Sequence, residues 1–218
     1  TLNTDIRSQI QSLADKYAKQ LGKQITHRMQ EMLQDDRSHY LIYRVLGIHE
    51  DEGMLIDAYQ NRGRFLYKYA GAFLEEACVL CIQSKYPDAK KTQIPNTSSS
   101  RPKNFEIDCL VGDLAHEIKW RDATADGDHI TKEHVRIQEI VKAGYVPVRV
   151  MFYYPQREQA QRIQNALKTL YHGVRGKYYA DEEAWNYIKE FTDIDLKAIL
   201  EDIALRRDEE GNHETCSV

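Results

Sequence analysis

The sequence has little of what marks a secreted, membrane or low-complexity protein. Only four of its 218 residues are cysteine, Cys78, Cys81, Cys109 and Cys216, too few for a disulfide framework in so long a chain. Its 11 Gly and 5 Pro are too few for a disordered or collagen-like chain. No apolar run reaches the roughly 18–20 residues of a membrane span, and the N-terminus lacks the apolar core of a signal peptide. We therefore expect a soluble protein of a reducing cytoplasm, with no membrane partner.

The formal net charge of −4 does not exclude a nucleic-acid partner, because the charge is unevenly distributed. Residues 132–179 contain nine Lys/Arg against three Asp/Glu, a basic block of the kind that binds phosphate. Residues 181–218 contain twelve acids against four bases. The acidic C-terminal segment thus hides a basic middle in the total.

Helical periodicity dominates about the first 85 residues. Apolar residues spaced by three or four predict a long amphipathic helix over residues 3–34. Shorter helices are predicted over residues 38–47 and 51–61, and another from Arg64 to Tyr86, where Pro87 ends it.

The pattern changes after this helical region. Residues 94–103 are polar and predict a loop, whereas Phe105–Val111 and Leu114–Trp120 alternate as strands and Tyr145–Tyr153 is an apolar strand. Further helices are predicted over residues 129–143, 156–171, 181–191 and 195–206. This pattern predicts an α/β fold, a mixed central β-sheet flanked by helices, with a helical N-terminal layer.

The first two strands are predicted to pair as a hairpin. Gly112-Asp113 separates them, and Gly in the first central position favours a type II′ turn. The turn sets the register, with Val111 opposite Leu114 and therefore Asp108 opposite Glu117. One face of the hairpin is then mostly apolar and suited to a core: Phe105, Ile107, Cys109, Val111, Leu114, His116, Ile118 and Trp120.

On the other face, Asp108 and Glu117 meet as like charges, an arrangement that destabilises a hairpin. Lys119, two residues on, supplies one compensating positive charge. A bound Mg²⁺ would supply more, because this ion takes hard oxygen ligands. The alternative is an exposed strand whose charges simply point into water.

Asp108 followed by Glu117-Ile118-Lys119 resembles the signature of the PD-(D/E)xK nucleases, with Ile107 where the motif's name has proline. The resemblance implies a mixed sheet flanked by helices and hydrolysis of phosphodiester bonds with Mg²⁺, for which Mn²⁺ can substitute. It extends over about residues 70–152.

An upstream helix of that superfamily often carries a further acid in a Gly-x-x-x-Glu pattern, which Gly71 and Glu75 match, with Glu76 as the rival. The wider stretch 106–134 resembles type II restriction endonucleases, and within them the ApaLI-like group, which cuts a palindromic hexamer containing TGCA. On this basis we divide the chain into a helical N-terminal region for dimerisation or DNA wrapping, a catalytic core with C-terminal helices, and a flexible tail: residues 1–62, 63–206 and 207–218.

The resemblance implies roles for the site residues. Asp108 and Glu117 would ligate the metal, with the Ile118 carbonyl as a third oxygen. Lys119 would position or deprotonate the attacking water, or hold the phosphate. Glu75 would bind the metal directly or through water.

Two loops and one helix are candidates for DNA contact. One loop leads into the first catalytic strand and the other leaves the second, so both can reach DNA near the cut. Each loop is equally well interpreted as a solvent-exposed connection without a role in binding. Basic side chains recurring along the following helix suit phosphate contacts. The candidate DNA-binding residues are Asn96, Ser98, Ser99, Ser100, Arg101, Lys103, Arg121, Asp122, His129, Lys132 and Arg136.

The sequence therefore predicts a type II restriction endonuclease, which cuts both strands of double-stranded DNA at a short palindrome with Mg²⁺. We expect a homodimer, because two copies of one site cut the two strands of a palindrome. The resemblance implies a bacterial or archaeal cytoplasm and a partner DNA methyltransferase. The alternatives are a structure-specific repair or recombination nuclease of the same fold, and a non-catalytic α/β binding domain.

Two other signals are interpreted as structural. Cys78 and Cys81 share a helix and have no second Cys/His pair at zinc spacing, so we expect buried thiols. His116, His129 and His134 could suggest a metal site, but no ligand spacing emerges, and the predicted register turns His116 toward the apolar face.

Overall fold

The computed structural model describes residues 2–99, 101–122 and 127–215, with side chains described from residue 5 to residue 210 of these. The chain divides into two compact units, a helical unit of residues 11–73 and an α/β unit of residues 1–10 with 74–218. None of the helices in these described parts has the length and apolar content to span a membrane.

The helical unit contains most of α1 (Leu2–Gln34), all of α2 (Tyr40–Val45) and the first two-thirds of α3 (Glu50–Lys85). The separate helices predicted over 51–61 and 64–86 are wrong, because α3 runs unbroken through Gly63. A glycine inside a helix costs only about 1 kcal/mol, which packing along so long a helix readily offsets.

The α/β unit carries a five-stranded sheet in the order β1-β2-β3-β4-β5. Strands β1, β2 and β3 are antiparallel, and β3, β4 and β5 are parallel, so the predicted mixed sheet is confirmed. Its elements are β1 (Lys90–Pro95), β2 (Asn104–Val111), β3 (Leu114–Arg121), α4 (Asp128–Lys142), β4 (Val146–Tyr153), α5 (Glu158–Gly173), β5 (Lys177–Ala180), α6 (Glu182–Thr192) and α7 (Leu196–Thr215).

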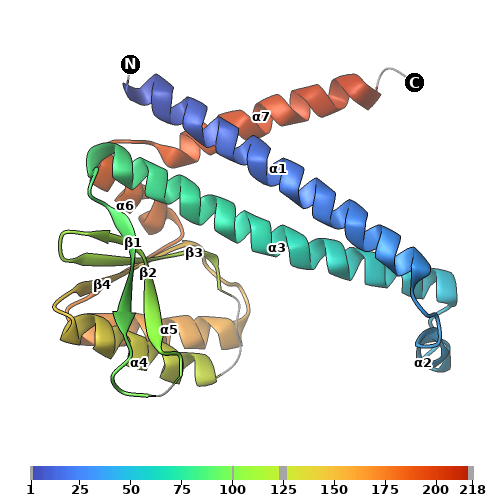
Figure 1. The fold of residues 1–218 in the computed structure, drawn as a ribbon, viewed down its shortest axis with the longest axis horizontal. Coiled ribbons are helices and arrows are strands. Elements are labelled where there is room, and N and C mark those ends of the chain that lie inside the picture. The colour runs from blue at the N-terminus through green and yellow to red at the C-terminus, as the bar shows by residue number, and fades with distance from the viewer. Residues whose placement is uncertain (1, 100, 123–126, 216–218) are drawn as a thin grey trace. The chain divides into compact units, whose positions relative to one another are not determined.

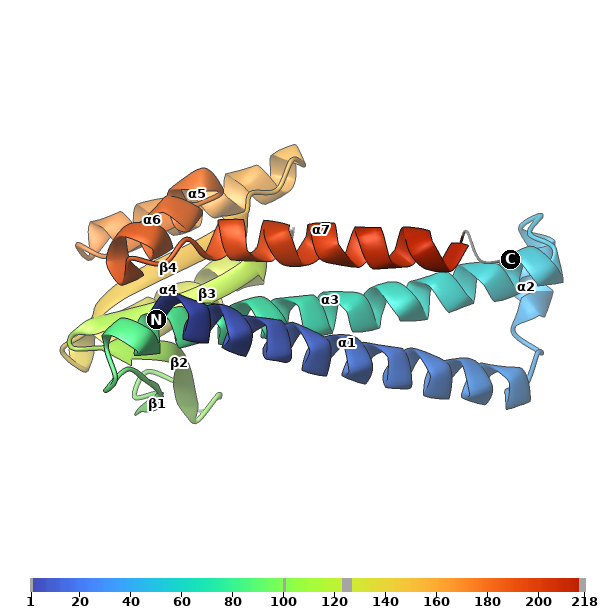
Figure 2. The ribbon, with the colours of Figure 1, turned by 90° about the horizontal axis from the view of Figure 1, so that it is seen from above.

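Helices cover both faces of this sheet (Figures 1 and 2). On β4, Met151 packs into a core with Ile137 of α4 and Leu167 of α5. The next residue, Phe152, lies against the ring of Trp185 in α6, with ring centroids 4.4 Å apart. Because successive side chains of a strand point to opposite faces, α4 and α5 cover one face and α6 the other.

Three predictions about these elements are corrected. Strand β1 reaches into the beginning of the segment predicted as loop 94–103, because it is short and polar. Strand β5 was not predicted, because its four residues are too few to show an alternation. The tail expected to be flexible from residue 207 continues α7 as far as Thr215. The division expected between residues 62 and 63 lies instead after residue 73, and residues 1–10 belong to the α/β unit.

Candidate active site

The β2–β3 hairpin forms as predicted next to its turn. Gly112 has φ 58°, the positive value that the first central residue of a type II′ turn requires. Val111 pairs with Leu114, and Cys109 pairs with His116, so the predicted register is confirmed over this part. The three strands β1, β2 and β3 therefore hold Asp108 and Glu117 close to one another.

Beyond Cys109 the strand departs from the predicted alternation. The pairing of β2 with β1 shifts between Lys90 and Thr92, which marks a β-bulge. Ile107 consequently packs with Ile94, Ala115 and Ile140, so its predicted place on the same face as Ile118 is wrong. A bulge inserts one residue and so turns the following side chains to the other face.

The bulge gives Asp108 a backbone partner. Its carboxylate Oδ2 accepts a hydrogen bond from the Ile118 N–H at 2.8 Å. Asp108 and Glu117 are only 5% and 6% exposed, so the alternative of two acids pointing into water is wrong. Burial, and then the charge of Glu117, raise the pKa of Asp108 from 3.8 to about 7.

Glu117 is held by two cations. Its Oε1 lies 2.6 Å from Lys119 Nζ, and its Oε2 forms an ion pair with Arg136. Burial alone would raise the pKa of Glu117, but Arg136 and Lys119 together lower it below the ordinary value. Burial would likewise lower the pKa of Lys119, but Glu117 and Asp108 raise it. Glu117 is therefore negatively charged and Lys119 positively charged near neutral pH.

A third acid reaches this site from α3. Lys91 Nζ bridges Glu75 Oε1 and Glu106 Oε1, at 3.0 Å from each. The charge of Glu75 also raises the pKa of Asp108. Lys91 was missed in the sequence, where it stands in a short polar segment without a motif.

The donors fit a divalent cation in chemical type. Asp108 and Glu117 offer hard carboxylate oxygens. Burial, and then the charge of Glu117, raise the pKa of Asp108, and a bound cation would favour its ionised form. In the arrangement of the described residues, no three His, Cys, Asp or Glu side chains already form a metal-binding group.

Comparison with known protein families decides the class of this site. The model of the ApaLI-like restriction endonucleases matches residues 2–205. The chain belongs to the ApaLI-like restriction endonuclease family. No curated protein and no solved structure matches it.

In this restriction endonuclease the catalytic strands are backed by a buried ionic network that was not predicted. Arg149 on β4 is fully buried and stands opposite Glu117 in the parallel register. Its Nη2 lies 2.7 Å from Asp122 Oδ2, and its Nη1 3.7 Å from Glu133 Oε1. Glu133 in turn pairs with Arg136 at 3.5 Å. A lone arginine inside the apolar strand VPVRVMF is the signal that could have revealed it.

This network corrects two predicted DNA contacts of the restriction endonuclease. Arg136 is 7% exposed and holds Glu117, so it does not face phosphate. The side chain of Asp122 is 12% exposed and also accepts a hydrogen bond from Gln164 at 3.1 Å, so it does not face bases. Cys78 and Cys81 are fully buried, as predicted.

Hydrogen bonds of Asn96 tie together several described residues of the loop between β1 and β2. Asn96 N–H donates to the Lys103 carbonyl at 2.9 Å, and its side-chain Oδ1 accepts from the N–H groups of Ser98 and Ser99, each at 3.1 Å. Arg101 and Lys103 are exposed. Ser100, another predicted contact, lies outside the described residues.

Glu139 of α4 anchors this loop. Its carboxylate accepts from the Thr97 hydroxyl at 2.7 Å, from the Ser98 hydroxyl and from Lys142 Nζ at 2.7 Å. The hydrogen bonds from Lys142, Ser98 and Thr97 lower the pKa of Glu139 to about 2. The serines expected to contact DNA are therefore partly engaged in fixing the loop.

The remaining predicted contacts lie around the second loop. Arg121 lies over the rings of Trp120 and Tyr153, 5.4 Å from each centroid. His129 Nε2 lies 3.0 Å from Asp122 Oδ2, whereas Lys132 is exposed on α4. His116 donates to or accepts from Cys109 and Tyr187 inside the core, which accounts for it structurally.

Proposed function

We propose that this restriction endonuclease hydrolyses both strands of duplex DNA at a short palindromic site with Mg²⁺, using Asp108, Glu117 and Lys119. The observation that carries the proposal is the buried pair of acids, one of which has its pKa raised to about 7, beside a charged lysine. Burying two acids so close together costs stability, and a bound cation would offset that cost in addition to Lys119 and Arg136.

Asp108 and Glu117 would hold the metal, with the Ile118 carbonyl as a further oxygen, and Glu75 would act directly or through water. A bound Mg²⁺ supplies charge stabilisation of the phosphate and a more acidic water. Mn²⁺, of similar ligand preference, would substitute.

Lys119 is proposed to position the attacking water or hold the phosphate rather than to act as the base. Its raised pKa favours the protonated form, which can donate hydrogen bonds but cannot accept a proton. Glu117 would keep this ammonium at the cleavage point, as the 2.6 Å ion pair suggests.

The β1–β2 loop is proposed as the main DNA-reading element, through Asn96, Ser98, Ser99, Arg101 and Lys103. Arginine and lysine pair with guanine, and asparagine with adenine. Its anchoring by Glu139 would reduce the entropy lost when it binds. On the other side, Arg121, His129 and Lys132 would contact the backbone.

Cutting both strands of a palindrome is proposed to require a homodimer, with one active site for each strand. Such an enzyme would act in a bacterial or archaeal cytoplasm beside a DNA methyltransferase that protects the host sites. The family match disfavours a repair nuclease and a non-catalytic binding domain.

The test is incubation of the purified chain with long duplex DNA in Mg²⁺ or in EDTA. Lys119→Ala runs alongside, with Lys168→Ala, an exposed lysine of α5, as the matched control. Discrete Mg²⁺-dependent bands that only Lys119→Ala abolishes are expected, and their sequenced ends would give the site. A smear, or cutting of branched DNA alone, would replace the proposal with the repair nuclease, and equal activity of both variants would remove Lys119 from the mechanism.

A further inference from the structure

Exposed apolar side chains are concentrated in the helical unit. Of the thirteen large hydrophobic side chains that are exposed in the described residues, ten belong to residues 11–73. They are Leu33, Leu41, Ile42, Val45, Leu46, Leu55, Ile56, Tyr59, Leu66 and Tyr67. A concentration of this kind on a soluble chain marks an interaction surface.

Half of them form a stripe along α3, which we call the α3 stripe: Leu55, Ile56, Tyr59, Leu66 and Tyr67. Their spacing of three, four and seven residues places them on one side of the helix. Asn61 is on the opposite side, where it contacts Arg28 and Met32 of α1. Gly63 lies within the stripe, and a Cβ added there would meet nothing within 4 Å.

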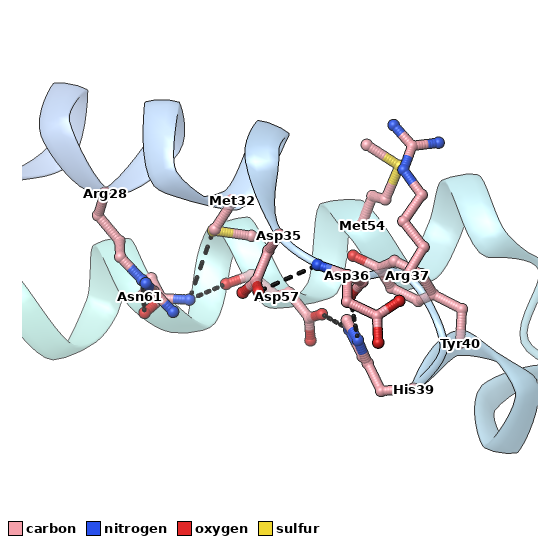
Figure 3. A pocket seen from close by; sticks show the side chains of 10 residues that line it. All are labelled: Arg28, Met32, Asp35, Asp36, Arg37, His39, Tyr40, Met54, Asp57 and Asn61. Atoms are coloured by element: carbon pink, nitrogen blue, oxygen red, sulfur yellow. Dashed lines mark hydrogen bonds and ion pairs between the residues drawn. The ribbon is translucent and has the colours of Figure 1, made fainter.

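Four others form the outer face of α2, which we call the α2 face: Leu41, Ile42, Val45 and Leu46, exposed by 56–74%. The inner side of α2 is fixed to α3. Tyr40 is buried, and the Tyr43 hydroxyl donates to Asp57 at 2.8 Å. His39 Nε2 lies 3.2 Å from Asp57 Oδ2 (Figure 3). The outward direction of the α2 face is therefore set by specific contacts.

The chemistry of this surface does not suit DNA. Residues 11–73 contain nine Lys/Arg and eight Asp/Glu, so the helical unit lacks the excess positive charge that phosphate binding needs. The DNA-wrapping role considered for the N-terminal region is therefore disfavoured, and a protein partner fits better.

The α3 stripe is complementary to itself. Glu52 lies near its beginning and Arg62 ten residues on, both exposed and on the same side of α3 as Tyr59. If two copies of α3 pack antiparallel around a two-fold axis near residue 57, Glu52 of each copy meets Arg62 of the other, and Leu55 meets Tyr59. Leu66 and Tyr67 then lie opposite the residues that precede α3 in the partner. A two-fold interface requires this self-complementarity.

We propose that the α3 stripe forms the interface between two copies of this chain; the α2 face, which packs on the Asp57 side of α3, lies outside it. This inference names the surface behind the homodimer of the proposed function and rests on it. At the observed exposures the stripe presents on the order of 500 Å² on each copy, so two copies would bury about 1,000 Å², the lower bound for a specific interface. Aromatic and leucine-rich contacts free of net charge are typical of such interfaces.

The proposal is tested by measuring the mass of the full chain in solution over a range of concentrations, using light scattering and sedimentation without DNA or metal. Wild type and Leu205→Glu, an exposed α7 control, are expected to be dimers, whereas Tyr59→Glu should be monomeric with unchanged helical circular dichroism. Glu52→Arg and Arg62→Glu should each weaken dimerisation at least tenfold, and Glu52→Arg combined with Arg62→Glu should restore it.

A monomeric wild type, or a Tyr59→Glu variant that dimerises like Leu205→Glu, would overturn the interface. Failure of the double charge exchange to restore the dimer would overturn the antiparallel pairing. Cleavage is measured separately. A dimeric wild type without nuclease activity would refute the proposed function and leave the interface standing. A monomeric wild type that cuts both strands at a discrete site would refute the interface and leave the proposed hydrolysis standing.

Discussion

Replacing Asp108 by asparagine should make the stability of the metal-free protein less sensitive to pH. The native carboxyl has its pKa raised from 3.8 to about 7, so the folded chain keeps a proton that the unfolded chain has already lost. Wild-type stability must therefore fall as pH rises from about 4 to 7, with the full penalty present above 7. Asparagine does not ionise, and its side-chain oxygen can still accept from the Ile118 N–H.

The magnitude follows from the size of the shift. Each unit of pKa is worth about 1.36 kcal/mol, so the wild type should lose roughly 3 kcal/mol relative to Asp108→Asn between pH 5 and pH 8. Since Asp108 is only 5% exposed, solvent screening reduces this little, but relaxation of the buried site lowers the expectation to about 1–3 kcal/mol. For a chain of this size that is a change of about 2–4 °C in Tm for each kcal/mol.

The assay is urea unfolding in EDTA at pH 5, 6, 7 and 8, followed by tryptophan fluorescence. Asp113→Asn, the same chemical change at the exposed turn of the hairpin, is the control and should follow wild type at every pH. The free energy of unfolding of Asp108→Asn minus that of wild type should increase with pH, whatever its value at pH 5. A difference that stays constant from pH 5 to pH 8 would refute the buried paired-acid reasoning.

Three further predictions concern the site and its supports. Mg²⁺ at millimolar concentration should raise the Tm of wild type at pH 8 and leave that of Glu117→Gln unchanged in differential scanning fluorimetry; equal shifts would place the metal elsewhere. Arg136→Ala should cost about 3–5 kcal/mol in urea unfolding, because Glu117 and Glu133 lose their buried partner, whereas Lys132→Ala on the exposed side of α4 should stay within about 0.5 kcal/mol. Ser98→Ala should weaken DNA binding severalfold by loosening the loop from Glu139, with Thr131→Ala on the exposed side of α4 as the matched control, and unchanged binding would show that the loop needs no anchor.

The sequence predicts those features of the site that depend only on neighbouring residues, namely the hairpin turn and the strand pairs next to it. A two-residue turn with Gly112 in its first central position fixes the pairs nearest to it, because turn geometry and side-chain alternation leave one register. The same reasoning predicts that Asp108 and Glu117 come close together. Their burial could not be predicted, because it depends on helices α3 and α4, which are distant in sequence.

What the sequence conceals are contacts set by tertiary structure. The bulge that turns Ile107 depends on how β1 pairs with β2, and β1 itself is a short polar strand with little strand propensity. From the sequence, Arg136 is predicted to contact phosphate, because it lies on a helix that also carries exposed basic residues. Only the fold shows that it forms an ion pair with Glu117 instead. Arg149, by contrast, could have been recognised from the sequence. A charged residue inside an apolar strand is expected to be buried and therefore to need a buried partner.

The buried network behind β3 has a consequence for how this enzyme would discriminate between DNA sequences. Alternating charges run from Glu117 through Arg136, Glu133 and Arg149 to Asp122, which stands at the start of the loop after β3. A change of charge at Glu117 would alter the ion pair of Arg136 with Glu133. Because Glu133 also pairs with Arg149, it would in turn alter the ion pair of Arg149 with Asp122. If the acids bind a cation as proposed, thermodynamic reciprocity requires that any factor by which the cation changes the affinity for a DNA sequence equal the factor by which that DNA changes the affinity for the cation. Sequence selection and metal loading are then one coupled equilibrium.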